Sequence, residues 1–130
     1  MDNIKPGLAN ERNSFVTNDR MATQVGSGDV EVLATPALAA LMETAAMNAI
    51  ASHLGEGQTS VGVYLEVEHI APTPLGGAIR ARAEVTEVKG STVTFKVEAW
   101  DDKEQIGKGT HRRVVVERDR FMKRVEGKKP

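Results

Sequence analysis

The chain has 130 residues, of which 40% are hydrophobic, 27% charged and 4% aromatic, a composition typical of one globular domain. Its 17 Lys and Arg residues against 18 Asp and Glu residues give a formal net charge of -1, which argues against a nucleic acid bound through bulk electrostatics. The absence of Cys excludes disulfides, thiolate metal clusters and cysteine nucleophiles, so any chemistry depends on His, carboxylates, hydroxyls or the backbone.

The N-terminal segment is polar and contains Pro6 and Gly7, so we interpret residues 1–13 as a loose arm. An extended piece follows at about Ser14 to Val25, and Gly26 begins a break. The segment lacks the apolar run of a signal peptide, and no later stretch approaches the length of a membrane span. We therefore expect a cytoplasmic protein with no membrane partner.

One strong helix signal runs from Pro36 to about His53, with Thr35 as the expected N-cap and Gly55 as the expected C-terminal stop. At ~1.5 Å per residue this helix is roughly 27 Å long, enough to cross the domain. Small or apolar residues lie on all its sides, a pattern typical of a helix that other structure encloses.

Four later segments alternate apolar and polar residues, as half-buried strands do. They cover residues 61–67, 79–85, 93–99 and 106–117. Short turn-like links between them predict an antiparallel meander. One curled sheet around the central helix is the simplest way to bury both, which predicts an α+β hot-dog fold over residues 14–117. Exposed sheet edges favour a homodimer or a higher oligomer, and residues 118–130 are expected to form a basic, solvated tail.

Glu43 is the only formally charged residue between Pro36 and Leu54. An ionised carboxylate in an enclosed place costs several kcal/mol unless it is paired, hydrogen-bonded or neutralised. Such carboxylates cluster at active sites, which favours a catalytic role for Glu43. The alternative is a structural one, in which the side chain meets water through a gap in the sheet or pairs with a basic group.

His69 continues the odd-numbered apolar series of its strand, so we expect its ring to face the helix. Glu43 and His69 could then form a carboxylate–imidazole pair in which the acid orients the ring. The alternative is a core histidine satisfied by a backbone carbonyl. Thr35 lies about 12 Å along the helix from Glu43, so a shared site requires an irregular helix start or a partner protomer.

Two further residues could serve such a site. Gly62 interrupts a strand, which indicates a bulge or a close approach, and its N–H is a candidate oxyanion donor. Arg113 could offer a planar cationic donor, although a solvated rim position explains it equally well. His53 and His111 are assigned no role, because helix capping and strand exposure account for them. No paired histidines have metal-ligand spacing and no phosphate-binding glycine loop occurs, so we expect no metal and no cofactor.

Four motifs carry a family resemblance. They are Ala34-Thr35-Pro36, Leu41-Met42-Glu43-Thr44-Ala45, the stretch from Val67 to Pro74 that contains His-x-Ala-x-Thr-Pro, and Ile106 to Arg113 with Gly-Thr-His-x-Arg. In order and spacing they resemble the fluoroacetyl-coenzyme A thioesterase group of hot-dog proteins over roughly residues 32 to 124. The resemblance implies that Thr35, Glu43 and His69 are the catalytic set and that Gly62 and Arg113 line the acyl pocket. It also implies a coenzyme A thioester as substrate and a homodimer with sites at the protomer interface.

The resemblance ends ahead of the helix. The specialised members carry a longer, phenylalanine-bearing segment that covers the acyl pocket, whereas residues 16–34 contain no aromatic residue. Hydrolysis of a small acyl-coenzyme A is therefore the expected activity, without selectivity for fluoroacetyl being implied. Two alternatives remain: a hydratase or dehydratase that uses the same acid–base pair, and a non-catalytic module that binds an acyl thioester or an apolar metabolite. Arg80, Arg82 and the basic tail are candidates for contacts with the coenzyme A phosphates.

Overall fold

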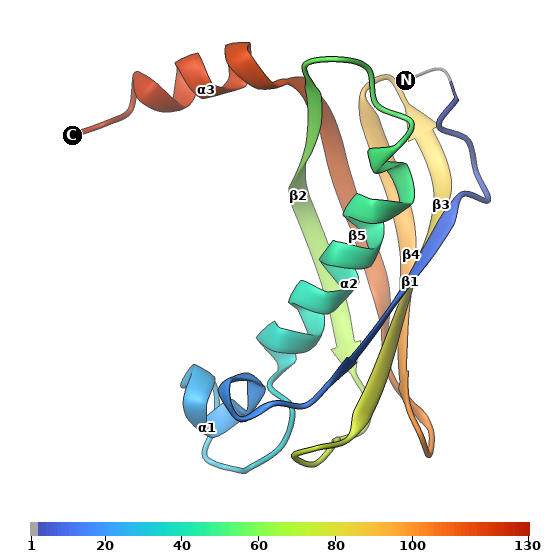
Figure 1. Ribbon diagram of the computed structural model, residues 1–130, viewed down its shortest axis with the longest axis vertical. Coiled ribbons are helices and arrows are strands. Elements are labelled where there is room, and N and C mark those ends of the chain that lie inside the picture. Colours follow the sequence, from blue (N-terminus) through green and yellow to red (C-terminus); the bar gives the residue numbers. More distant parts are fainter. Residues whose placement is uncertain (1–2) are drawn as a thin grey trace.

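The computed structural model describes residues 3–130, and it contains a five-stranded antiparallel sheet curled around one long helix (Figure 1). In chain order the elements are β1 (Ala9–Phe15), the 3-10 helix η1 (Asn18–Arg20), α1 (Ala22–Val25), α2 (Thr35–Ala51), β2 (Gln58–His69), β3 (Ala78–Lys89), β4 (Thr92–Asp101), β5 (Gln105–Glu117) and α3 (Arg118–Glu126). The predicted α+β architecture with one central helix is confirmed. No helix in this part of the chain is long and apolar enough to span a membrane.

The core lies between α2 and the concave face of the sheet. The strands supply alternate residues to it, as their period of two predicts, and the helix supplies its sheet-facing side. The buried strand residues include Ala81, Ala83, Val85, Val93, Phe95, Val97 and Ala99, and the buried helix residues are Leu38, Met42, Ala45, Ala46, Ala49 and Ile50. Several of these are alanines, whose small side chains let the helix lie close to the strands.

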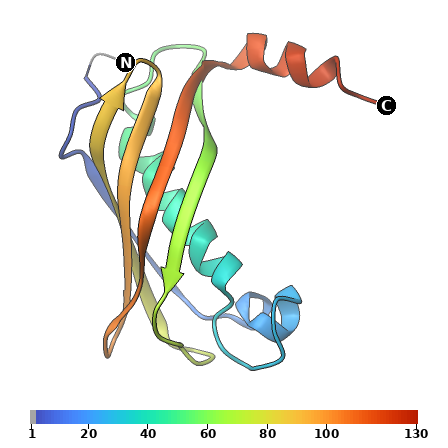
Figure 2. The same cartoon turned by 180° about the vertical axis from the view of Figure 1, so that it is seen from behind.

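The sheet is not the predicted meander of four strands. Its order is β1-β3-β4-β5-β2, so β2 pairs with β5 at the far edge and not with β3, its successor in the chain (Figure 2). Only β3, β4 and β5 form a meander through short links. The chain between β2 and β3 runs from residue 70 to 77, passes Pro72 and Pro74, and crosses from one side of the sheet to the other. Two prolines prevent a tight two-residue hairpin there.

The N-terminal part of the chain also differs from the prediction. Residues 9–13, expected in a loose arm, belong to β1, which pairs with β3 from Ala9 to Phe15. Ile4 is buried, and the Gly7 N–H donates to the Val85 carbonyl at 2.8 Å. Of the stretch expected to be extended from Ser14 to Val25, Ser14 and Phe15 lie in β1, and most of the remainder forms η1 and α1. β1 lies at the edge of the sheet, and three consecutive residues in it, Glu11, Arg12 and Asn13, are exposed, so it has no apolar alternation to reveal it.

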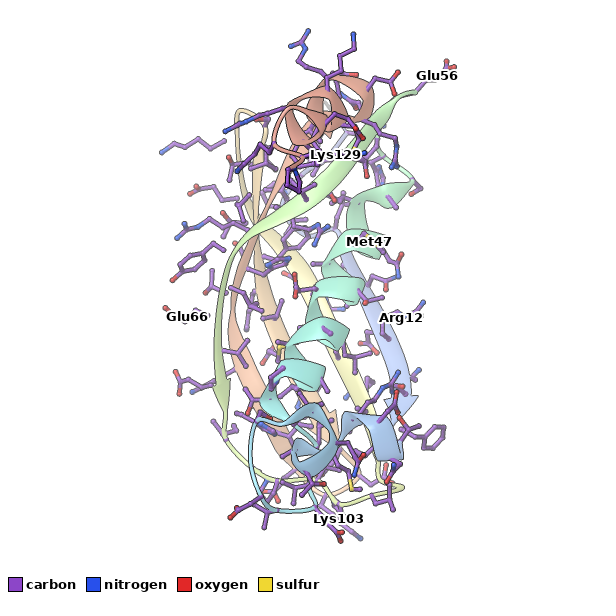
Figure 3. The ribbon with its side chains drawn as sticks, turned by 90° about the vertical axis from the view of Figure 1, so that its left-hand side faces the viewer. Arg12, Met47, Glu56, Glu66, Lys103 and Lys129 are labelled. Carbon is purple, nitrogen blue, oxygen red and sulfur yellow. The ribbon has the colours of Figure 1, made fainter. Side chains whose placement is uncertain are left out.

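Helix α2 begins and packs differently from the expectation. Ala34, not Thr35, is the N-cap residue, and no side chain caps the helix, so Thr35 is the first helical residue. The sheet covers only one side of α2 within a single chain, and Met47 on the other side is 43% exposed (Figure 3). The expected basic tail forms α3, an exposed helix that projects away from the sheet.

Candidate active site

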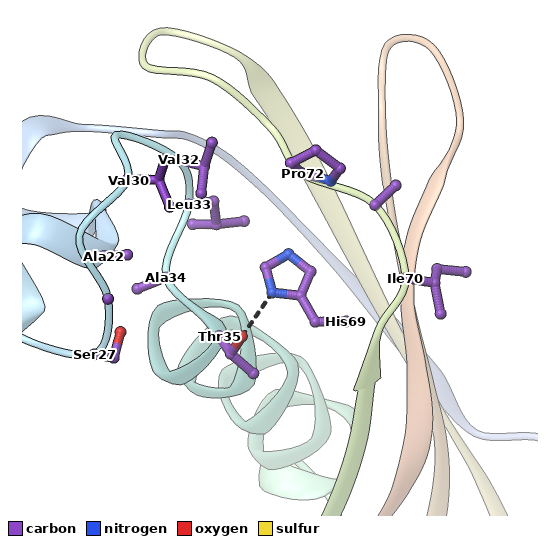
Figure 4. A pocket seen from close by; sticks show the side chains of 12 residues that line it. Ala22, Ser27, Val30, Val32, Leu33, Ala34, Thr35, His69, Ile70 and Pro72 are labelled. Carbon is purple, nitrogen blue, oxygen red and sulfur yellow. Dashed lines mark hydrogen bonds between the residues drawn. The ribbon is translucent and has the colours of Figure 1, made fainter.

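The first turn of α2 meets the last residue of β2. Thr35 Oγ1 and His69 Nδ1 lie 2.8 Å apart and share a hydrogen bond (Figure 4). The His69 ring is half-buried, and burial lowers the pKa of His69 from its usual 6.5, so the neutral imidazole predominates at neutral pH. Its other ring nitrogen, Nε2, is buried and has no hydrogen-bond partner within residues 3–130. A neutral imidazole next to a hydroxyl is the geometry of a base beside a nucleophile.

A cavity of about 340 Å³ lies beside this pair. The start of α1, the segment after it, the first turn of α2, the end of β2 and the link from β2 to β3 surround it. Aliphatic and small side chains form most of the wall, among them Ala22, Val30, Val32, Leu33 and Pro72. The Thr35–His69 pair thus opens into a mainly apolar pocket, as Figure 4 shows from close by.

A second cluster surrounds Glu43, about two helical turns beyond Thr35. A Cβ added to Gly62 would lie 3.0 Å from Glu43 Oε2, 3.2 Å from His111 Cε1 and 3.5 Å from Arg113 Nη1. The pairing of β2 with β5 shifts between Gly62 and Tyr64, so the bulge predicted at Gly62 is present. The absence of a side chain at this glycine lets the carboxylate of the helix approach the strand.

Hydrogen bonds fix Arg113 beneath this glycine. Its Nε donates to Ser60 Oγ at 2.9 Å and its Nη2 donates to the Ser60 carbonyl at 3.0 Å. His111 Nδ1 lies 2.8 Å from the Tyr64 carbonyl, which can only accept, so Nδ1 carries the ring proton. Nε2 of the same ring then accepts from Arg113 Nη1 at 3.2 Å. Burial is the main cause that lowers the pKa values of His111 and Arg113, and the negative charge of Glu43 opposes it at both.

His111 is the residue that the sequence analysis missed, because it is 1% exposed and not on the surface of the strand. The alternation of residues along β5 predicts that the His111 side chain is buried. His111, Arg113 and Val115 alternate along β5, and all three are buried on the same face. Arg113 is 7% exposed, so the alternative of a solvated rim position is wrong.

The two predicted halves of the site do not meet within one chain. His69 bonds to Thr35, whereas Glu43 lies with Gly62 and Arg113, so the expected Glu43–His69 pair is not formed in the single chain. Two strand arginines proposed for phosphate contacts already have partners. Arg80 pairs with Glu11 and stacks over Trp100, and Arg82 pairs with Glu11 and Glu84.

A single antiparallel sheet wrapped around one long helix is the arrangement of the hot-dog fold. A solved structure of a fluoroacetyl-CoA thioesterase has a TM-score of 0.93 and 30% identity to this chain, covering 99% of this chain and 100% of that one. A solved hot-dog-like protein from Thermanaerovibrio acidaminovorans gives a TM-score of 0.90 and 28% identity, covering 98% of this chain and 94% of that one. The hot-dog fold is therefore confirmed.

The family follows from the sequence comparisons. A family model described as fluoroacetyl-CoA-specific thioesterase matches residues 16–119. The fluoroacetyl-CoA thioesterase of Streptantibioticus cattleyicolor is 38% identical over 100 residues, covering 77% of this chain and 72% of that protein. The chain belongs to the fluoroacetyl-CoA-specific thioesterase family.

Proposed function

We propose that the protein hydrolyses a small acyl-coenzyme A thioester. The observation that carries the proposal is the 2.8 Å contact between Thr35 Oγ1 and the neutral ring of His69, at the edge of an apolar pocket. Family membership and the similarity to named thioesterases support the same reaction.

The chemistry follows from the pair. With its hydroxyl as donor, Thr35 passes its proton to His69 as the oxygen attacks the thioester carbonyl. A C–O bond forms, the C–S bond breaks, and coenzyme A leaves as the thiol with the proton that His69 returns. Water, deprotonated by the same ring, then attacks the acyl-threonine ester; the bond between the acyl carbon and Thr35 Oγ1 breaks, His69 returns the proton to Thr35 Oγ1, and the carboxylic acid leaves. Direct attack by water on the thioester, with His69 as base, is the shorter route through the same groups.

Glu43, Gly62 and Arg113 supply the electrostatics of this reaction. A backbone N–H at Gly62 is suited to bind the developing oxyanion, and Arg113 is a fixed cation next to it. Glu43 is suited to stabilise the positive charge that the His69 ring gains when it takes the proton. Because these groups lie apart within one chain, we propose that a second copy brings its Glu43 cluster to the Thr35–His69 pair.

This arrangement requires a homodimer. Two features of the chain support one: β2 stands at the sheet edge with Val63 58% exposed, and α2 has an open side. The substrate is a soluble coenzyme A ester, which supports a cytoplasmic location. No cofactor is needed, since coenzyme A enters as part of the substrate.

Release of free thiol from acyl-coenzyme A substrates tests the reaction. We expect turnover by the parent protein, retention of activity in Thr35→Ser, and a loss of at least about a hundredfold in kcat for Thr35→Ala and Glu43→Gln. Thr44→Ala is the matched control, because the Thr44 hydroxyl only bonds back to the Ala40 carbonyl of its own helix at 3.0 Å.

Other outcomes separate the alternative activities. Loss of enoyl-thioester absorbance without thiol release would indicate a hydratase instead. Ligand binding without turnover under any condition would indicate a binding module, and an inactive Glu43→Gln beside an active parent eliminates that alternative.

A further inference from the structure

The pocket beside the Thr35–His69 pair specifies the acyl group, an inference that rests on the proposed function. We propose that this pocket holds a short branched aliphatic acyl chain of about four to six carbons, and not the two-carbon acyl group. The family is named for the two-carbon fluoroacetyl group, so a longer acyl chain is argued from the walls of the cavity in this chain.

The chemistry of the wall selects an uncharged, apolar group. No Asp, Glu, Lys, Arg, Phe, Tyr or Trp lines the cavity, and its polar side chains are those of Ser27, Thr35 and His69. Two of these three form the reacting pair, so the rest of the cavity offers an acyl chain few hydrogen-bond partners. A carboxylate or hydroxyl on the acyl group would meet few side-chain hydrogen-bond partners against this wall. Succinyl and malonyl thioesters are therefore disfavoured.

The size of the cavity argues against a two-carbon acyl group. At about 30 Å³ per water, 340 Å³ is the volume of roughly eleven waters. An acetyl group on Thr35 has the volume of about two of these and would leave most of the apolar wall of the chain uncovered. A branched chain of four to six carbons reaches the walls that Val32, Leu33 and Pro72 provide around the His69 ring (Figure 4).

Val30 marks the mouth of the pocket. It is 61% exposed although it is a large apolar residue, and it follows the polar Gly26–Asp29 stretch. Exposed apolar side chains at the rim of a cavity gain from burial when a ligand covers them. An acyl chain bound to Thr35 and directed along the pocket passes this side chain, so Val30 contributes to selection by chain length.

The first experiment measures kcat/KM for acetyl-, isobutyryl-, isovaleryl- and succinyl-coenzyme A by thiol release. Burial of one methylene corresponds to about a fourfold gain, so three added carbons give on the order of fiftyfold if fully covered and about tenfold if half covered. We expect isovaleryl to exceed acetyl by about tenfold to fiftyfold and succinyl to be the poorest. Equal or greater activity with acetyl would refute the pocket assignment while leaving hydrolysis intact.

Substitutions in the pocket wall test which residues determine the preference for acyl-chain length. Val30→Phe narrows the pocket and is expected to reduce the isovaleryl-to-acetyl ratio by about tenfold. Val32→Phe at the next wall position provides a second test if the first variant does not fold. Val25→Phe is the matched control, because it makes the same replacement at an exposed residue of α1 that does not line the pocket. An equal loss for every acyl chain in Val30→Phe would mean that the cavity takes the common pantetheine arm, which overturns the proposal.

Binding of S-ethyl- and S-isopentyl-coenzyme A, which cannot be hydrolysed, tests the pocket assignment independently of the proposed hydrolysis. We expect the isopentyl thioether to bind about tenfold more tightly by calorimetry, and Val30→Phe to remove the difference. If the protein hydrolyses no thioester but keeps this preference, the proposed function fails and the pocket assignment stands. If both thioethers bind equally, the pocket assignment fails whatever the activity.

Discussion

Replacement of His111 tests the hydrogen-bonded cluster that holds Arg113. His111→Phe keeps an aromatic ring next to Phe95, whose centroid lies 6.0 Å from that of His111, but removes both ring nitrogens. The Tyr64 carbonyl and Arg113 Nη1 then lose their partners in a buried place. Each buried unsatisfied group costs about 1–3 kcal/mol, so we expect the free energy of unfolding to fall by about 2–4 kcal/mol after the gain from the added apolar ring.

Two amide variants separate the contributions of the two hydrogen bonds of His111. His111→Asn places its amide near the position of Nδ1 and can still donate to the Tyr64 carbonyl, whereas His111→Gln reaches farther and can still accept from Arg113. We expect each to lose about half of the Phe effect, roughly 1–2 kcal/mol. Only His111→Asn frees the Arg113 guanidinium from its ring contact, so His111→Asn should also lower activity more than His111→Gln does.

Urea-induced unfolding at one fixed protein concentration, followed by circular dichroism, measures these differences. His53→Phe is the control, because the half-buried His53 side chain makes no hydrogen bond within the described residues, and its effect should stay under about 0.5 kcal/mol. A loss below about 0.5 kcal/mol in His111→Phe would show that the ring contributes only packing and that our account of Arg113 is wrong.

Three further predictions follow from the glycines and the histidines. Gly109→Ala would place a Cβ 1.8 Å from a backbone carbonyl oxygen of β2, and we expect a loss of about 3 kcal/mol or more in the free energy of unfolding, measured with urea. Gly62→Ala would place a Cβ 3.0 Å from Glu43 Oε2, and we expect thiol release to fall at least about tenfold while stability falls by less than about 1 kcal/mol. The pKa values of His69 and His111 are lowered from 6.5, so the unfolded chain takes up protons before the folded chain as the pH falls. The contribution of these two rings to stability is therefore present above pH 6.5 and is lost below it. The loss is at most about 1.4 kcal/mol per pH unit for each ring.

Each of these has its control. Gly127→Ala meets its first neighbour at an ordinary 3.5 Å, so it should leave stability unchanged and isolate the clash at position 109. An unchanged rate in Gly62→Ala would show that the Glu43 carboxylate can move without consequence. For the pH dependence, unfolding between pH 8 and 5 should give a shallower slope in His111→Gln than in the parent. Stability that is flat or rises toward pH 5 would contradict the lowered pKa values.

Much of the fold could be predicted from the sequence because its signals are local. The alternation in β3 and β4 and the alanine-rich run of α2 are visible within a dozen residues. β1 could not be found in this way, since Asn10, Glu11 and Arg12 form a strand only through pairing with β3, about seventy residues later. The position of β2 beside β5 also depends on long-range pairing, although Pro72 and Pro74 in the link from β2 to β3 argue against a hairpin between those two strands.

The site was predicted in composition and only partly in geometry. The residues alone suggest Thr35 as a helix cap and His69 as a partner of Glu43, whereas the family resemblance places all three in one catalytic set. Within one chain only Thr35 and His69 bond to each other. Which helical turn faces which strand residue depends on the crossing of α2 over the curled sheet, and no local pattern encodes that crossing. His111 is the exception, because its place in the alternation of β5 was readable.

Thr35 and Glu43 stand on one continuous helix, and this has a consequence for how such a site can change. Each residue of an α-helix turns the next by about 100° and advances it by about 1.5 Å. Deleting or inserting one residue between these two positions would therefore rotate one side chain about the helix axis by about 100° relative to the other. Substitutions can change the side chains at these two positions, but the helix fixes the distance and the angle between them.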